Sequence, residues 1–170
     1  MIVELKENFS GGETPFKTVL EYSKTQSELI FNFTCFNSKL FSAFSEYNAP
    51  IYKGDVCEVF LCVGEDLSEY YEIEVAPNGT VFFAKIKNDG KLNVTFLPNL
   101  LKTSAKVTDV GYNVEIVVPF GAIGVSSHPI RFNAFRIETE GGIPDKNLLS
   151  LSPTLCGNFH KPEKFILLEV

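Results

Sequence analysis

Acidic side chains form the most prominent group of candidate functional residues in this chain. Glu58 follows Asp55 in the segment KGDVCEVFL, where a carboxylate among apolar neighbours can hydrogen-bond two hydroxyls of a ligand at once. The alternative is an ion pair across the predicted sheet, for which Arg136 is the natural partner. Both interpretations can hold together, because an arginine often orients a carboxylate. We therefore take Glu58 as the first candidate contact for a polar ligand.

Glu72 and Glu74 raise the hypothesis of glycoside hydrolysis, which uses two carboxyl groups flanking a sugar bond. Two residues apart on one face of a strand, their Cα atoms would lie about 6.5 to 7 Å apart, a spacing that this chemistry permits. Acidic pairs on exposed strands are common, however. The sequence therefore favours two solvated carboxylates over a catalytic pair.

The other metal-ligating and nucleophilic residue types form no complete motif. The 4 cysteines lack C-x-x-C spacing, so we expect small buried thiols rather than a zinc site. No G-x-S-x-G elbow presents a serine to a histidine; we take His128 as a surface residue and His160 as a loop anchor or ligand contact. We expect no cofactor, with a structural calcium ion in the oxygen-rich loop 64–69 as the alternative.

Composition limits the classes of partner. With 170 residues the chain is expected to form a single domain over residues 1–170. The net charge of -6 argues against nucleic acid, and no apolar run is long enough to cross a membrane. The first eight residues, MIVELKEN, lack the basic start and apolar stretch of a signal peptide, so we expect a cytoplasmic protein unless a signal was removed.

The elements that must position these residues are almost all strands. Apolar and polar residues alternate with period two, and Pro77-Asn78-Gly79 is typical of a tight hairpin turn. The pattern predicts an all-β fold, a single antiparallel β-sandwich resembling a jelly roll, with at most one helical turn at 120–123. The predicted strands are 17–23, 29–36, 56–63, 70–75, 80–87, 92–97, 106–110, 112–118, 130–138 and 164–170.

The same alternation assigns side chains to faces of the sheets. The core side is predicted to hold Leu29, Phe31, Phe33, Val59, Leu61, Ile73, Val75, Phe82, Ile86, Val114, Ile116, Phe135 and Ile137. The opposite face is predicted to display Glu58, Phe60, Tyr70, Glu72, Glu74, Phe83, Lys85, Arg136 and Glu138. A face that mixes carboxylates, an arginine and aromatic rings is suited to a ligand that is polar but has flat apolar sides.

Four segments, taken in order, resemble the family 9 carbohydrate-binding modules, and more closely the family-9-like, DOMON-like β-sandwich domains. They are GDVCEVF at 54–60, YYEIEVAPNG at 70–79, RFNAFR at 131–136, and LSLSP at 149–153 leading to NFHKPEKF at 158–165. Both arginines of the chain lie in the third segment. The resemblance extends from residue 29 to the C-terminus.

The resemblance implies a β-sandwich that binds a mono- or oligosaccharide without cleaving it. In that family two tryptophans hold the sugar ring, while a carboxylate, an arginine and an asparagine bond its hydroxyls. Tyr52 stands where the first aromatic residue would fall, and Glu58 matches the carboxylate. Arg136 and Asn147 are the candidates for the remaining polar contacts.

The chain departs from this family at the second aromatic residue and at one arginine. It has no tryptophan, and Leu151 stands near the expected position of the second ring, so Tyr47, Phe83 or His160 is left to supply that face. Glu72 replaces an arginine. Two alternatives to sugar binding therefore stay open: a structural or protein-interaction sandwich that has lost its sugar, and a glycoside hydrolase.

Overall fold

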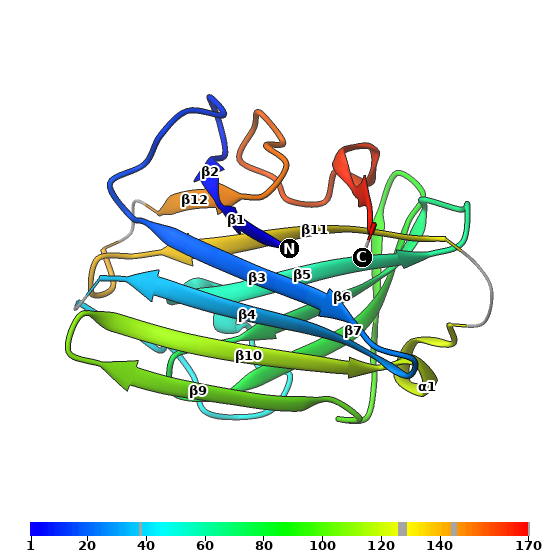
Figure 1. Cartoon of the computed structure of the whole chain (residues 1–170), viewed down its shortest axis with the longest axis horizontal. Helices are drawn as coiled ribbons and strands as arrows, with labels where there is room; N and C mark the ends of the chain where they lie inside the picture. The colour runs from blue at the N-terminus through cyan, green and yellow to red at the C-terminus, as the bar shows by residue number, and fades with distance from the viewer. Residues whose placement is uncertain (38, 126–128, 144–145, 170) are drawn as a thin grey trace.

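The protein forms two antiparallel β-sheets that pack against each other (Figure 1). The structure is a computed structural model that describes residues 1–37, 39–125, 129–143 and 146–169. The first sheet has five strands in the order β1-β3-β4-β10-β9. Their bounds are Ile2–Glu4 (β1), Thr18–Lys24 (β3), Glu28–Phe36 (β4), Gly111–Pro119 (β10) and Lys102–Thr108 (β9).

The second sheet follows the order β2-β12-β11-β5-β6-β7-β8, and β13 also pairs with β11. The strand bounds are Lys6–Glu7 (β2), Asn147–Ser150 (β12), Ile130–Glu138 (β11), Val56–Val63 (β5), Glu69–Val75 (β6), Val81–Asn88 (β7), Leu92–Phe96 (β8) and Ile166–Leu167 (β13). A four-residue helix, α1, spans Phe120–Ile123, and two 3-10 turns span Ile51–Lys53 (η1) and Pro162–Lys164 (η2). Among the described residues, no helix has the length and apolar character needed to span a membrane.

Turn chemistry sets the register of the central hairpin. Between β6 and β7, Gly79 has a φ of 84° and donates its N–H to the carbonyl of Ala76, while Ala76 N–H bonds the carbonyl of Thr80. Glycine adopts this positive φ without steric penalty, which explains why the Pro-Asn-Gly signal is reliable. The hairpin register then places Glu74 directly opposite Phe82.

A hydrophobic core fills the space between the sheets. Phe31 and Phe33 from β4 lie in it with Leu61 and Ile73 from the second sheet, and all four are almost fully buried. Phe132 from β11 contacts the Tyr22 ring edge-on at a centroid distance of 5.0 Å. Burying large apolar side chains at this interface is the main stabilising contribution to such a sandwich.

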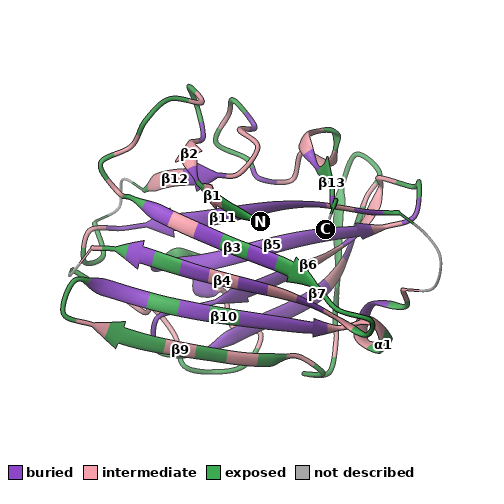
Figure 2. Cartoon of the chain, in the orientation of Figure 1, coloured by how far each residue is buried: buried purple, intermediate pink, exposed green. Residues whose placement is uncertain are grey.

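A second hydrophobic cluster covers the outer face of the second sheet. Phe60, Phe82 and Phe135 project outward from the strands and pack with Ile51 and Phe159, which come from loops far away in the sequence. Consequently β5 and β11 are buried on both faces over almost their whole length, and they are mostly purple in Figure 2. The outer-face side chains of these strands are therefore packed against loops, and the candidate site lies among them.

The predicted all-β sandwich is confirmed, and most strand bounds agree with the structure. The strands at 56–63 and 130–138 and the helical turn at 120–123 have the predicted bounds. The strand predicted at 106–110 is instead β9, Lys102–Thr108, because its Thr, Ser and Lys residues give no apolar signal. The short strands β1, β2 and β12 were not predicted, and only Ile166–Leu167 of the segment 164–170 is a strand.

Candidate functional site

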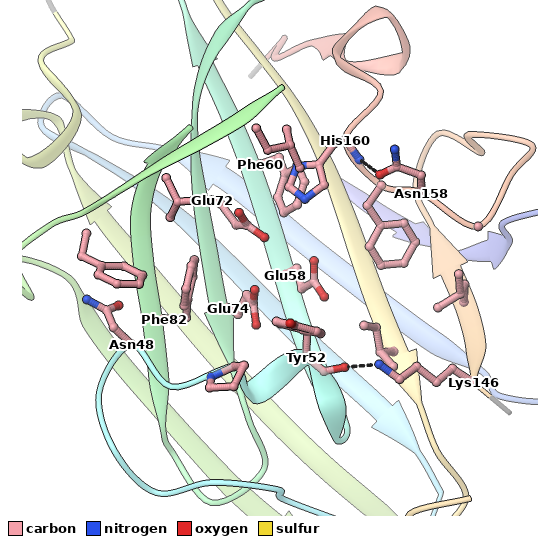
Figure 3. A pocket seen from close by; sticks show the side chains of 18 residues that line it. Asn48, Tyr52, Glu58, Phe60, Glu72, Glu74, Phe82, Lys146, Asn158 and His160 are labelled. Carbon is pink, nitrogen blue, oxygen red and sulfur yellow. Dashed lines mark hydrogen bonds between the residues drawn. The ribbon is translucent and has the colours of Figure 1, made fainter. Parts of the chain in front are cut away.

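A pocket of about 580 Å³ opens on the outer face of the second sheet (Figure 3). Its floor comes from β5, β6 and β7, and its rim comes from β8, the start of β12 and the loops near residues 50 and 158. The aromatic lining residues are Tyr52, Phe60, Phe82, Phe96, Phe159 and His160. The charged and amide lining residues are Glu58, Glu72, Glu74, Lys146, Asn48 and Asn158.

Tyr52 is positioned by the segment that leads into β5. It lies in η1 beside Ile51, which is buried and anchors the turn. At Gly54 an added Cβ would meet the carbonyl oxygen of Phe41 at 2.6 Å, so this close approach requires glycine. The buried Asp55 accepts a hydrogen bond of 2.7 Å from the Phe41 N–H. These contacts hold the exposed Tyr52 ring at the edge of the pocket.

Lys146 contacts Tyr52 in two ways. Its Nζ donates a hydrogen bond of 2.5 Å to the Tyr52 carbonyl oxygen and lies over the Tyr52 ring, 5.3 Å from the centroid. Both residues line the pocket. One face of the ring is therefore covered by a cation, an arrangement that stabilises the ring position.

His160 lies at the opposite end of the pocket from Tyr52, with the three glutamates between them (Figure 3). Its ring packs on Phe60 at a centroid distance of 5.2 Å, and its Nδ1 lies 2.9 Å from the Tyr70 hydroxyl oxygen. Asn158 Oδ1 accepts the His160 backbone N–H at 2.9 Å. Burial lowers the pKa of His160 to about 4, so the ring is neutral at pH 7 and can accept the Tyr70 proton.

Glu58, Glu72 and Glu74 meet on the pocket floor. Glu58 on β5 pairs in register with Glu74 on β6, and Glu72 is two residues away on the same face. The three side chains offer oxygen atoms that all lie within 4.8 Å of one another. Each residue is at most 8% exposed.

Burial raises the pKa of all three carboxyl groups. For Glu58 and Glu74 desolvation is the larger cause, and repulsion from neighbouring carboxylates adds to it. The pKa of Glu72 rises to about 7, again because of burial. The prediction that Glu72 and Glu74 are solvated is therefore wrong. The loops that carry Ile51 and Phe159 pack over the outer face of the sheet and remove these carboxyls from water.

Arg136 is not in the pocket, and the predicted contacts with a ligand or with Glu58 are wrong. In the β11–β5 register Arg136 lies opposite Cys57, whose side chain belongs to the core between the sheets. The guanidinium is fully buried there, pairs with Glu138 and donates a 2.9 Å hydrogen bond to Thr18 Oγ1. It therefore joins the two sheets, and Phe135 and Ile137 take the outward positions.

Phe83 is likewise on the other face of its strand from the predicted one. It is buried in the core between the sheets, whereas Phe82 lines the pocket. Lys85, which was assigned to the outer face together with Phe83, does not line the pocket and pairs with Glu69 at 2.6 Å. Both faces of β7 carry large apolar residues, so the pattern alone does not assign them.

Two further candidates lie outside the pocket lining. Asn147 donates a 3.2 Å hydrogen bond to Glu140 Oε1 at the start of β12, although its neighbours Lys146 and Leu148 line the pocket. Tyr47 is exposed, and its hydroxyl donates to the Leu97 carbonyl at 2.8 Å. Of the three candidates for a second ring, Tyr47, Phe83 and His160, only His160 lines the pocket.

Several pocket residues were not predicted as site residues. Phe96 and Lys146 come from segments remote in sequence from β5, and Asn158 and Phe159 lie in the fourth motif without a predicted role. Glu58 in β5 and the acidic pattern of β6 were the local signals for the floor of the pocket.

The calcium ion considered for loop 64–69 stays a prediction. In that loop Asp66 Oδ1 accepts the Ser68 N–H at 2.9 Å, and Glu69 pairs with lysines. Within the part of the chain that the structure describes, the acidic, cysteine and histidine residues form one group of three with metal-ligand spacing, that of Glu58, Glu72 and Glu74. His128 lies outside the described residues. The thiols of Cys35, Cys57 and Cys62 are free and buried, as expected, whereas Cys156 is free and only partly buried.

Neither a protein-family model nor a curated protein sequence matches the chain, but solved structures do. A protein from Bacteroides uniformis ATCC 8492, to which carbohydrate binding has been assigned, aligns with a TM-score of 0.82 at 15% identity, covering 99% of this chain and 85% of its own. A family 9 carbohydrate-binding module from Caldicellulosiruptor kristjanssonii, in its glucose complex, aligns with a TM-score of 0.68 at 15% identity. The alignment covers 98% of this chain and 82% of the module. The cellotriose complex of the module aligns with a TM-score of 0.66 at 16% identity, and the alignment covers 96% of this chain and 80% of the module.

These likenesses show the fold. The chain has the fold of a family 9 carbohydrate-binding module, as its four motifs predicted.

Proposed function

We propose that this protein is a non-catalytic carbohydrate-binding domain and that the sugar occupies the pocket between Tyr52 and His160. One observation carries the proposal: a fold shared with sugar-binding modules brings Tyr52 and Glu58, the two residues that match the family pattern, into one open pocket. A volume of about 580 Å³ is within the usual range for small-molecule sites. The family 9 module among the structural neighbours was solved with glucose and with cellotriose, which makes glucose-based sugars the first ligands to test.

In this proposal Tyr52 is the stacking platform. The C–H groups on one side of a pyranose ring form an apolar patch that packs on an aromatic face. Lys146 lies over one face of the Tyr52 ring, which leaves the opposite face for a sugar. His160, the candidate second ring, is neutral at pH 7, because burial lowers its pKa to about 4, and it is held by Asn158 and Tyr70.

The carboxyl groups are the proposed polar contacts. Glu58 Oε1 and Glu74 Oε2 are buried and have no hydrogen-bond partner among the described residues. An unpaired buried acceptor costs about 1 to 3 kcal/mol, so a ligand hydroxyl that donates to it relieves an existing penalty. Glu58 and Glu74 therefore take the part that Arg136 and Asn147 were predicted to take.

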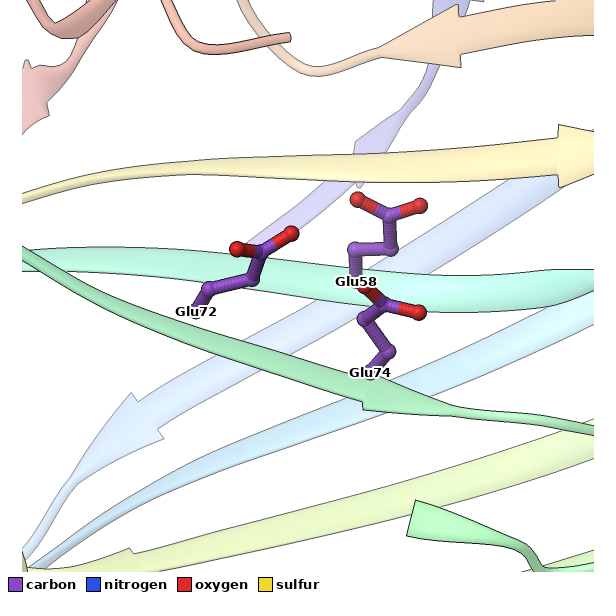
Figure 4. Close-up of side chains that lie close together, drawn as sticks. All are labelled: Glu58, Glu72 and Glu74. Carbon is purple, nitrogen blue, oxygen red and sulfur yellow. The ribbon is translucent and has the colours of Figure 1, made fainter. Parts of the chain in front are cut away.

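The arrangement of the carboxyls supports binding rather than hydrolysis. A glycosidase places its two carboxyl groups on opposite sides of the scissile bond. Glu58, Glu72 and Glu74 instead rise from adjacent strands on the same side (Figure 4). The alternative of a protein-interaction sandwich without a ligand site would be favoured by a pocket filled with side chains, whereas this pocket is open.

Calorimetric titration with glucose, cellotriose and a wider panel of mono- and oligosaccharides tests the proposal. We expect weak binding, because sugar hydroxyls are well hydrated before they bind. Tyr52→Ala should weaken it by about tenfold, which corresponds to about 1.4 kcal/mol for a lost stacking contact. Chromatography of each oligosaccharide after long incubation should show no cleavage.

Tyr47→Ala is the matched control. Tyr47 and Tyr52 are similarly exposed, at 41% and 44%, and lie five residues apart, but Tyr47 does not line the pocket. Its substitution should leave sugar affinity unchanged. Absence of binding to every sugar, or an equal effect of the two substitutions, would contradict the proposed site.

A further inference from the structure

The three glutamates have a geometry that fits one small cation. Their side chains point to the same side of the sheet and bring their carboxyl groups together (Figure 4). Oxygen atoms from all three lie within 4.8 Å of one another. Two oxygens bound to the same calcium ion are at most about 5 Å apart, twice the usual Ca–O distance, so a single ion can contact all three carboxyl groups.

Unpaired oxygen atoms in the cluster indicate a missing partner. Glu58 Oε1 and Glu74 Oε2 are buried and accept no hydrogen bond from the described residues. Glu58 is 2% exposed and Glu74 is 1% exposed, and both residues line the pocket. Buried carboxylates are normally paired or bound to a metal, because leaving them alone in a medium of low polarity is unfavourable.

The charge balance favours a divalent ion. The acidic lining residues are Glu58, Glu72 and Glu74, and the basic side chain near them is Lys146. A metal ion binds the ionised form of a carboxyl group, and three carboxylates with one ammonium leave two negative charges, which one divalent cation neutralises. A monovalent cation or a ligand amine would leave one negative charge uncompensated.

We propose that Glu58, Glu72 and Glu74 form a calcium-binding site on the floor of the pocket. The three carboxyl groups supply only oxygen ligands, which suit calcium rather than zinc, and they provide between three and six of the six to eight oxygens that calcium takes. Magnesium requires strict octahedral geometry and retains several waters, which the rings of Phe60 and Phe82 beside the cluster do not favour. The site lies in the pocket proposed for sugars but requires no sugar.

Calorimetric titration of calcium chloride into protein freed of metal with EDTA and then exchanged into buffer at pH 7.5 tests the inference. We expect one site per chain and an increase in melting temperature with calcium, because the ion binds only the folded state. The double variant Glu58→Gln, Glu74→Gln should bind calcium more than about tenfold more weakly, since even outer-shell changes weaken metal binding by about 10-fold to 100-fold.

Glu163→Gln is the control, because Glu163 is an exposed acid on η2 with 61% of its side chain accessible. It should bind calcium like the wild type. Circular dichroism and thermal unfolding in EDTA check that the double variant folds, and the single variant Glu74→Gln replaces it if it does not. Because glutamine keeps the shape and removes like charges, the variants should be at least as stable as the wild type without metal.

Three results would overturn the inference: no heat of binding and no thermal shift, equal affinity in the wild type and the glutamine variants, or tighter binding of magnesium chloride than of calcium chloride. These titrations contain no sugar. The proposed sugar binding is measured separately with EDTA present, so the two ideas can fail independently.

Discussion

His160→Gln should change how the stability of this protein depends on pH. The His160 ring packs on Phe60, and its Nδ1 lies 2.9 Å from the Tyr70 hydroxyl oxygen. Burial lowers its pKa from 6.5 to about 4. Below pH 6.5 the histidine of the unfolded chain takes up a proton that the folded protein does not, so acid favours unfolding until the folded pKa is reached. A glutamine at this position retains an acceptor for Tyr70 and takes up no proton.

The size of the effect follows from the pKa difference. A fall from 6.5 to about 4, at about 1.36 kcal/mol per pKa unit, lowers the free energy of unfolding by about 3 kcal/mol between pH 7 and pH 4. The buried glutamates act in the opposite direction. Glu72 has its pKa raised to about 7, so the folded state gains stability as pH falls from 7 toward 4.5. That contribution is present in the wild type and in the variant, and it cancels when the two are compared.

The assay is urea unfolding of both proteins at pH 7, 6, 5 and 4 in EDTA. Unfolding is monitored by far-UV circular dichroism, because the chain has no tryptophan to report it by fluorescence. The variant should be somewhat less stable at pH 7, where it loses ring packing. Relative to the wild type it should then gain about 3 kcal/mol by pH 4. Parallel pH profiles for the two proteins would refute the reasoning, because they would mean that His160 titrates normally in the folded state.

Two further predictions concern the backbone of the first sheet and the loop that carries His160. Gly111→Ala should destabilise the protein by more than about 4 kcal/mol or prevent folding, because the new Cβ would lie 1.9 Å from the Cys35 carbonyl oxygen. The control is Gly121→Ala in α1, where a Cβ meets no atom within 4 Å, and it should change stability by less than about 1 kcal/mol in the same urea assay. Similar effects of the two substitutions would contradict this account. Asn8→Ala removes two hydrogen bonds, of 2.7 and 2.9 Å, between Asn8 and Thr154 at the base of the loop that carries His160. We expect the free energy of unfolding to fall by about 3 kcal/mol and sugar binding to weaken. Wild-type stability together with wild-type sugar affinity would count against the role of this anchor.

Strands whose polar residues lie on one face were assigned correctly from the sequence. In β6 the acidic residues alternate with Ile73 and Val75, and the structure places Glu72 and Glu74 on the outer face and the aliphatic residues inside. In β5 Glu58 alone identified the outer face. In both strands the acidic residues alternate with apolar residues, and this period-two pattern assigned the faces.

Strands that are apolar on both faces were assigned to the wrong face. In β11 the charge of Arg136 suggested an outward position, but an ion pair with Glu138 allows it to be buried. In β7 Phe82 and Phe83 are equivalent in the sequence pattern, and only the pairing of Phe82 with Glu74 decides which of them lies beside the pocket. A register between strands is a tertiary property, and a shift of one residue reverses every side chain.

The sequence alone determined the β-sandwich and the hairpin at Gly79, because these depend on local periodicity and turn chemistry. The family resemblance singled out Tyr52 and Glu58, which line the same pocket. Only the tertiary structure decided that Glu58, Glu72 and Glu74 are buried together. Their burial requires loops from distant parts of the chain to pack on the outer face of the sheet. The removal of water by those loops turns three ordinary acidic residues into a cluster with raised pKa values, and no local pattern encodes it.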